Sequence, residues 1–303
     1  MSAPRVTVWL AAYPKSGNTW VRALLSAAYR GPGWGSEWLG LYQPGSLRTL
    51  HDGLGLAGAR LSRQQLAPLR RLAVEQLPAD EEGTVLCKVH DAFLPDADGH
   101  PLARVRGINR AIYVVRDPRD VAVSYAHHFA VDHATAVAVM AAGNDLGRSL
   151  APGPSTGAGG GEVGVDVDAY ADNYLLPFWS RHVTSWCDQD AMDVLVVRYE
   201  DLHRRPAETL AAMLDLLEVS RTPSQIADAV EAACFARLAF AEIIHPFAEA
   251  AAPDRVFFRR GVVGGWRDEL DHDLARRIER DHHAVMARFG YPINPALPEG
   301  RTA

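Results

Sequence analysis

The sequence predicts a single α/β domain, because three apolar, strand-like runs each end in polar residues at which a turn or a helix begins. These runs occupy residues 6–12, 85–90 and 111–116. The chain has 303 residues, of which 48% are hydrophobic and 22% are charged, and this composition provides enough apolar material for a sizeable core. One domain over residues 1–303 is therefore the simplest division of the chain.

Charge and cysteine content exclude several classes of protein. The formal net charge of −6 argues against non-specific nucleic-acid binding, so an anionic ligand would need a local basic pocket. Cys87, Cys187 and Cys234 are too few and too scattered for a disulfide framework or a zinc site, and they fit a reducing compartment. The apolar run 6–12 is too short for a membrane span and lacks the charged head and cleavage site of a secretory signal. We therefore expect a cytoplasmic protein without a nucleic-acid or membrane partner.

Residues 13–20 (YPKSGNTW) join the first strand-like run to residues 21–28, where good helix formers place apolar residues at helical spacing. A strand, a tight polar turn and a helix N-terminus form an anion site, because the free N–H groups and the helix dipole favour negative charge. Gly17 lets the backbone approach a ligand, Lys15 supplies an ammonium group, and neutral donors come from Ser16, Asn18 and Thr19. The nucleotide-triphosphate loop pattern is not met, because the lysine precedes the glycine. An ordinary turn with an exposed lysine is the alternative for this motif alone.

Residues 85–90 (VLCKVH) predict a buried parallel strand that ends in two polar side chains. Ligands of open α/β sheets bind beyond the carboxyl ends of the strands. Lys88 and His90 are two positions apart on an extended segment, so they project to the same side. A neutral histidine suits proton abstraction from an acceptor hydroxyl. A polar strand end that faces solvent is the alternative interpretation.

Residues 111–125 (AIYVVRDPRDVAVSY) contain a β-rich run that ends at Arg116 and is followed by a helix to about residue 130. Asp117 is a credible N-cap, and Pro118 suits the first helical position. Ser124 would then lie about two turns into the helix. An arginine at a strand end can form paired hydrogen bonds with phosphate oxygens, while the serine donates a hydroxyl. The alternative interpretation of Arg116 and Asp117 is purely structural, as a helix start that is stabilised by a salt bridge.

The end of this helix is not expected to bind a metal. Four residues of the metal-ligating type occur there: His127, His128, Asp132 and His133. Adjacent histidines diverge on a helix, however, and no cysteine or second carboxylate pair completes a site. These side chains could instead line an acceptor cleft.

Two connecting segments have either an acceptor-binding or a structural interpretation. The glycine-rich loop after residue 30 carries Trp34, Trp38 and Tyr42, which either line an acceptor pocket or close over the loop. Glycine and proline at about 143–168 predict a flexible insertion that is either a lid or a linker. Helices are expected at about 61–77, with Ser62 as N-cap, and at about 167–187, whose aromatic residues are assigned mostly to the core.

The last third of the chain predicts one more strand and three helices. Residues 194–202 are an apolar run that ends in polar groups, and helices follow at about 206–217, 223–234 and 271–289. Arg259 and Arg260 directly precede Gly261. Two adjacent cations before a glycine can surround a phosphate with guanidinium groups and a backbone N–H.

Taken in this order, the motifs resemble those of sulfotransferases of the cytosolic type. YPKSGNTW is similar to the family's loop for the 5′-phosphosulfate of 3′-phosphoadenosine 5′-phosphosulfate (PAPS). The Lys-x-His strand end and the segment from Arg116 to Ser124 are similar to its catalytic and 3′-phosphate motifs. The resemblance implies a mostly parallel central sheet flanked by helices on both faces, as in P-loop nucleotide kinases. It also implies transfer of a sulfuryl group from PAPS to a hydroxyl or amine of a small-molecule acceptor.

The resemblance further implies roles for single residues, with no metal. His90 would be the catalytic base, while Lys15, helped by Lys88, would stabilise charge on the leaving phosphate. Tyr199 and Phe235 are assigned to the adenine. The complete set of cofactor-binding residues implied is Lys15, Ser16, Gly17, Asn18, Thr19, Trp20, Arg116, Ser124, Tyr199, Phe235, Arg259, Arg260 and Gly261. Arg260 replaces a lysine of the family and should keep phosphate binding. Gly265 replaces an acid of the family, so the contact that this acid makes is in doubt for this chain.

Two rival functions remain at the level of the sequence. A kinase-like phosphotransferase would need a magnesium ligand and a standard phosphate loop, neither of which is found. A non-catalytic PAPS-binding protein would keep the arginines and make His90 dispensable. High alanine, arginine and glycine content hints at a GC-rich bacterial genome, and candidate acceptors are a phenol, a sugar hydroxyl or a peptide natural product. The oligomeric state stays open, because the family's common dimerisation motif has no clear counterpart before Phe257.

Overall fold

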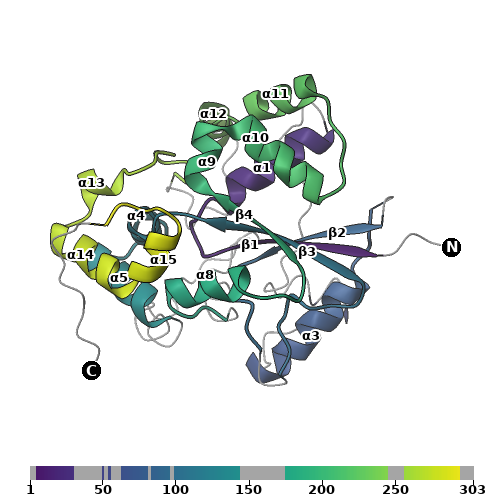
Figure 1. Cartoon of the computed structure of the whole chain (residues 1–303), viewed down its shortest axis with the longest axis horizontal. Coiled ribbons are helices and arrows are strands. Elements are labelled where there is room, and N and C mark those ends of the chain that lie inside the picture. The colour runs from purple at the N-terminus through teal and green to yellow at the C-terminus, as the bar shows by residue number, and fades with distance from the viewer. Residues whose placement is uncertain are drawn as a thin grey trace, which may run out of the picture.

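The computed structural model describes residues 5–30, 50, 54–55, 63–80, 83–95, 99–143, 175–244 and 256–293 (Figure 1). Several sequence-based expectations lie outside these residues. They concern the aromatic loop after residue 30 with Trp34, Trp38 and Tyr42, the N-cap Ser62, and residues 144–168 of the glycine-rich insertion.

Four parallel strands form the central sheet, in the order β2–β1–β3–β4. The strands are β1 (Val6–Ala12), β2 (Thr84–Val89), β3 (Ile108–Val115) and β4 (Asp193–Arg198). Ala11 is in register with Val89, and Val115 with Arg198, so the carboxyl ends of the strands share one edge. The chain passes from β2 across β1 to β3, which makes this edge the switch point at which open α/β sheets bind ligands.

Helices cover both faces of the sheet, as expected (Figure 1). Their bounds are α1 (Asn18–Arg30), α3 (Arg63–Gln76), α4 (Pro118–Phe129), α5 (His133–Ala142), α8 (Trp179–Cys187), α9 (Tyr199–Arg204), α10 (Pro206–Leu216), α11 (Pro223–Ala232), α12 (Phe235–Ile244), α13 (Trp266–Glu269), α14 (His272–Asp281) and α15 (His283–Arg288). The expected α/β fold with a parallel sheet is confirmed.

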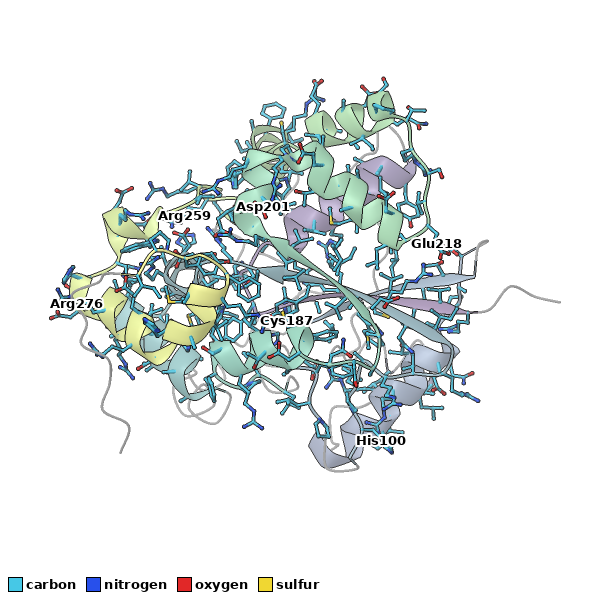
Figure 2. The ribbon with its side chains drawn as sticks, in the orientation of Figure 1. His100, Cys187, Asp201, Glu218, Arg259 and Arg276 are labelled. Atoms are coloured by element: carbon cyan, nitrogen blue, oxygen red, sulfur yellow. The ribbon has the colours of Figure 1, made fainter. Side chains whose placement is uncertain are left out.

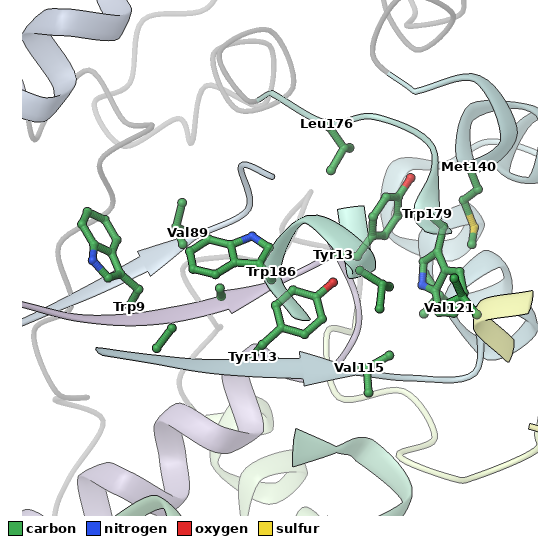
Figure 3. Close-up of a cluster of buried hydrophobic side chains, with 14 of the residues drawn as sticks. Trp9, Tyr13, Val89, Tyr113, Val115, Val121, Met140, Leu176, Trp179 and Trp186 are labelled. Carbon is green, nitrogen blue, oxygen red and sulfur yellow. The ribbon is translucent and has the colours of Figure 1, made fainter. Parts of the chain in front are cut away.

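Alternation along the strands explains why both faces are covered. Trp9 and Tyr113 belong to one buried cluster, which includes Trp179 of α8 (Figure 3). Leu10 and Ile112, one position away on the same strands, belong to a second cluster with residues of α1, α10 and α11. Strands buried on both faces read as continuous apolar runs, which is why the sequence revealed them.

Three boundaries differ from the sequence-based expectation. Tyr199 begins a helix instead of extending β4, and the described part of the helix expected at 167–187 starts only at Trp179. Pro177 explains the late start, because proline lacks an N–H donor and restricts the residue before it. The helix expected at 271–289 is divided at His282, whose ring packs edge-on against Trp179 with centroids 5.4 Å apart.

The described residues on either side of the stretch 144–174 lie next to each other. Gly143 has a φ of +80°, and a Cβ at this position would lie 2.7 Å from the carbonyl oxygen of Leu176. The N–H of Leu175 donates to Asp91 at 2.9 Å. Asp91 also pairs with Arg70 through two hydrogen bonds of 3.0 and 2.6 Å, and both side chains are buried. The rejoining chain is thus held at the end of β2.

Candidate active site

The turn between β1 and α1 has the geometry of an anion-binding site. Lys15 and Gly17 have φ values of +69° and +110°, so the backbone turns sharply before α1 begins at Asn18. The first N–H groups of a helix have no acceptor within it and point out of the N-terminus. Ser16 is 1% exposed, and its hydroxyl has no hydrogen-bond partner among the described residues. A buried hydroxyl of this kind is a ready donor for an anion.

Two other side chains of the turn have partners within the protein. The Asn18 amide donates to the carbonyl of Leu10 at 2.9 Å, which fixes the turn to β1. The ammonium of Lys15 lies 4.1 Å from the centroid of the Phe257 ring, a cation–π contact. Lys15 therefore lies against the segment that leads to Arg259.

His90 follows β2, and its ring is oriented by the end of β1. Its Nδ1 atom is 2.7 Å from the carbonyl oxygen of Ala12, and because a carbonyl only accepts, Nδ1 donates. In the neutral ring Nε2 then holds the lone pair, which is the tautomer that a general base needs. His90 is 5% exposed and Lys88 is 4% exposed, so both side chains are buried at the strand end.

A second buried histidine supports the main chain at His90. The Nε2 atom of His182 lies 3.0 Å from the carbonyl oxygen of His90, and its Nδ1 lies 2.9 Å from the hydroxyl of Tyr113. Nε2 therefore donates to the carbonyl, and Nδ1 accepts from Tyr113. Burial lowers the pKa of His182 to about 4, so the ring stays neutral. Sequence analysis did not identify this residue, which α8 brings to the site from far along the chain.

Arg116 connects three parts of the site. Its guanidinium lies 4.1 Å from the centroid of the Tyr199 ring and donates to the carbonyls of Lys15 and Val262 at 3.3 and 3.2 Å. Its buried Nε has no partner among the described residues. A stacked guanidinium beside an anion turn is well arranged for a phosphate group. Ser124 is half-buried on α4, and within the described residues no hydrogen bond joins it to Arg116.

Two aromatic rings pack directly on two glycines of the site. A Cβ on Gly17 would lie 2.5 Å from the Tyr199 ring, and a Cβ on Gly261, whose φ is +58°, would lie 2.1 Å from the Phe235 ring. Trp20 lies edge-on to Tyr199, with ring centroids 5.6 Å apart. The aromatic residues that the resemblance assigns to the cofactor therefore border the two phosphate-type loops.

His203 is an aromatic neighbour that sequence analysis missed. Its ring centroid lies 4.7 Å from that of Trp20 and 5.0 Å from that of Tyr199. Burial, together with the positive charge of Arg116, lowers the pKa of His203, which favours the neutral ring at neutral pH. The available signal was its position four residues after Tyr199, which places both on one side of a helix. The expectation of a strand over residues 194–202, which ends directly before His203, concealed it.

A carboxylate on α12 holds the segment that precedes the arginine pair. Glu242 accepts hydrogen bonds from the backbone N–H groups of Phe257 and Phe258, at 2.6 and 2.8 Å. Phe258 is buried, and Phe257 is the ring in contact with Lys15. The segment is thereby fixed over the turn that follows β1.

Asp120 on α4 holds the turn that follows the arginine pair. Its carboxylate accepts from the N–H groups of Gly264 and Trp266, at 2.7 and 2.9 Å. Burial raises the pKa of Asp120, while Arg116 and these two N–H groups oppose the rise. The backbone on both sides of Gly265 is therefore held by a carboxylate from another element. Gly265 is the position at which the related family has an acid.

Arg259 and Arg260 are paired with carboxylates of α13. Arg259 donates to Glu269 from both terminal nitrogens, at 2.8 and 2.9 Å. Arg260 donates to Glu269 at 2.7 Å and to Asp268 at 2.8 Å. Figure 2 shows Arg259 between α13 and α9.

Metal-type residues near the end of α4 have other contacts. Asp132 accepts from the N–H of Thr135 at 2.7 Å and caps α5, and the ring of His128 lies edge-on to Phe257. In the part of the chain that the structure describes, no three histidine, cysteine or acidic side chains are grouped to hold a metal ion. Among the same residues, no helix is long and apolar enough to cross a bilayer.

The fold and the site together define an α/β protein with a phosphate-type turn, a histidine and an arginine at the carboxyl edge of a parallel sheet. The family described as "Sulfotransferase domain" matches residues 102–290, which is more than half of the chain. The chain therefore belongs to the sulfotransferase family.

Individual relatives are distant. Cytosolic sulfotransferase 12 of Arabidopsis thaliana is 25% identical over 56% of this chain, and the match spans only about half (48%) of that relative. Flavonol 3-sulfotransferase of Flaveria bidentis is 22% identical over 90% of this chain and 79% of its own length. The crystal structure of mouse sulfotransferase SULT7A1 in complex with PAP has a TM-score of 0.57 and 17% identity, covering 94% of this chain and 85% of its own. This structural likeness shows a shared fold.

Proposed function

We propose that this protein transfers a sulfuryl group from PAPS to a hydroxyl or amine of a small-molecule acceptor, releasing 3′-phosphoadenosine 5′-phosphate (PAP). The observation that carries the proposal is the contact set of Arg116, which joins the turn after β1 to the segment of Arg259 and stacks on Tyr199. Family membership and the PAP complex of the mouse structure support it.

The proposed placement of the nucleotide follows the two loops. The turn with Lys15 and the N-terminus of α1 receive the 5′-phosphosulfate, since backbone N–H groups and an ammonium converge there. The 3′-phosphate is held by Arg116, Ser124, Arg259, Arg260 and Gly261. The adenine of the nucleotide lies among Trp20, Tyr199 and Phe235, because aromatic faces stack well on a purine.

The proposed chemistry needs one general base for the acceptor and stabilisation of one leaving group. Nε2 of His90 takes the acceptor proton as the acceptor oxygen or nitrogen forms a bond to sulfur. The bond between sulfur and the bridging phosphate oxygen breaks on the opposite side, and that oxygen keeps the electron pair as part of PAP. Lys15, with Lys88, stabilises the charge that develops there. Positioning supplies the remainder of the rate enhancement for such an in-line transfer.

The proposed acceptor is a small molecule, such as a phenol or a natural product. Two relatives are named for acceptors of this size: the flavonol 3-sulfotransferase, and an amine sulfotransferase of Oryctolagus cuniculus that is 20% identical over 59% of this chain. Relatives named as cytosolic sulfotransferases, together with free cysteines at 87, 187 and 234, support a reaction in the cytoplasm. The proposal that this is the cytoplasm of a bacterium rests only on the high alanine, arginine and glycine content of the chain.

Calorimetric titration tests the proposal directly. We expect PAP to bind more tightly than ADP or ATP without magnesium, because only PAP carries a 3′-phosphate, and we expect Arg116→Ala to remove this preference. Incubation with PAPS and a panel of phenols and amines should then yield sulfated products. Tighter binding of ATP once magnesium is added would instead support a kinase-like phosphotransferase. PAP binding without turnover on any acceptor would support a non-catalytic PAPS-binding protein.

A further inference from the structure

The carboxylates of α13 use the guanidinium nitrogens that a 3′-phosphate would need. Both terminal nitrogens of Arg259 donate to Glu269 in a two-point pairing, and Arg260 divides its terminal nitrogens between Glu269 and Asp268. Arginine binds carboxylate and phosphate in the same planar, two-point manner. The same pair of donors on Arg259 therefore cannot fully serve both groups.

Carboxylates lie close to the arginines at this corner of the site. Asp268 and Glu269 pair with Arg259 and Arg260, and Asp120 accepts from the backbone of Gly264 and Trp266. Burial alone would raise the pKa of Glu269, but hydrogen bonds from Arg259 and Arg260 lower it overall, so the carboxylate is charged at neutral pH. The net charge of the chain is −6, so the protein as a whole has no excess of positive charge to attract an anionic cofactor.

We propose that Glu269 competes with the 3′-phosphate of the cofactor for Arg259 and Arg260, and thereby sets the affinity for PAPS and PAP. The inference rests on the proposed assignment of these arginines to the 3′-phosphate. Two-point binding of a phosphate by Arg259 requires Glu269 to release at least one terminal nitrogen. Glu269 is the stronger competitor, because its side chain is 26% exposed and contacts both arginines, whereas that of Asp268 is 66% exposed and contacts one.

The test compares nucleotide affinities of the wild type and of Glu269→Gln by calorimetry. Loss of one negative charge a few ångströms from a bound phosphate should tighten PAP binding by about fivefold to tenfold. ADP lacks the 3′-phosphate, so its affinity should change by less than about twofold over the larger distance. The matched control is Glu218→Gln, which breaks an ion pair with Arg110 at the far end of the molecule, as Figure 2 shows for Glu218 and Arg259. We expect the control to bind both nucleotides like the wild type.

The direction of the change in PAP affinity shows whether Glu269 competes with the phosphate or helps to position the arginines. A merely supporting Glu269 would weaken PAP binding when replaced, so unchanged or weaker binding by Glu269→Gln would overturn the inference. An equal gain for PAP and ADP would also overturn it, because that pattern reflects net charge alone. PAP binding that is unaffected by Arg259→Ala would refute the assignment on which the inference rests. Failure of the wild type to bind PAP would refute the proposed function itself.

Discussion

The imidazole of His90 donates a hydrogen bond to the carbonyl of Ala12 and has no proposed contact with the nucleotide, so its replacement separates an effect on turnover from an effect on nucleotide affinity. We expect His90→Ala to lower turnover by about a hundredfold or more, since a positioned base contributes a factor of about 10²–10⁴. PAP affinity should stay close to that of the wild type. Steady-state kinetics and calorimetry measure the two effects, with His272→Ala on the exposed start of α14 as control. Near-normal turnover of His90→Ala would remove this residue from the mechanism.

Gly261 is fixed by both its backbone and its neighbour. In Gly261→Ala a methyl group would meet the Phe235 ring at 2.1 Å, and the backbone would be strained at a φ of +58°. We expect the free energy of unfolding to fall by about 1–3 kcal/mol and PAP binding to weaken by about tenfold, because Phe235 must move. Chemical denaturation and calorimetry provide the measurements.

Gly290→Ala is a matched control for this substitution. Gly290 has a φ of +67°, but nothing lies within 4 Å of a Cβ built there. Only the cost of the left-handed backbone, about 1 kcal/mol, should therefore remain, with unchanged PAP affinity. If both variants bound PAP equally well, the packing of Phe235 on Gly261 would have no role in nucleotide binding.

At the scale of elements, Asp120 ties α4 to the turn before α13. Asp120→Ala removes the acceptor of two N–H groups, so we expect a loss of about 1–3 kcal/mol in the free energy of unfolding. We also expect weaker PAP binding, although Asp120 has no proposed contact with the nucleotide, because the arginine segment loses its anchor. Thermal melting and calorimetry check the two parts.

The corresponding control removes a carboxylate that also accepts a backbone N–H but, among the described residues, has no hydrogen bond to the segment of Arg259. Asp132→Ala deletes the N-cap of α5, which accepts from Thr135. It should leave PAP affinity unchanged. An unchanged affinity in Asp120→Ala as well would show that Asp120 is not needed to position the arginine segment.

The elements at the carboxyl edge of the sheet were largely predictable from the sequence. Apolar runs stop where a strand leaves the sheet, and Asp117 followed by Pro118 marked the start of α4, where the Asp117 side chain does accept from the N–H of Arg119. The end of β4 was not predictable, because Tyr199 and the residues after it suit a strand end as well as a helix start. His203 was missed for that reason.

Contacts between distant elements were beyond the sequence. His182 reaches the carbonyl of His90 only because α8 packs on the sheet, and no local pattern sets that distance. Likewise, any of many acidic residues could pair with Arg259, and the choice of Glu269 depends on where α13 lies. Long-range pairing of charges is set by tertiary packing, and periodicity and capping signals in the sequence carry no information about it.

For the molecule as a whole, two buried histidines predict sensitivity to acid. Burial lowers the pKa of His182 and of His282 to about 4. Above about pH 6.5 these rings are neutral in both the folded and the unfolded chain. Between about pH 6.5 and 4 these histidines bind protons in the unfolded chain but not in the folded protein. The free energy of unfolding should therefore fall, as the pH is lowered, by up to about 1.4 kcal/mol per pH unit for each histidine.

Denaturant titrations from pH 7.5 to 4.5 measure this loss, and His282→Gln provides the comparison. Glutamine does not titrate in this range, so the slope of stability against pH should be smaller for the variant by about one proton's contribution. Equal slopes for the variant and the wild type would show that His282 does not refuse a proton in the folded state.

The contact of Gly143 with Leu176 has an evolutionary consequence. Because the described ends of the chain on either side of residues 144–174 lie next to each other, a change in length between them does not require a strand of the sheet to move. Leu175, the first described residue after this stretch, is held by Asp91, which directly follows His90. Relatives of this protein can therefore differ in length between positions 143 and 175 while the carboxyl edge of the sheet keeps its geometry.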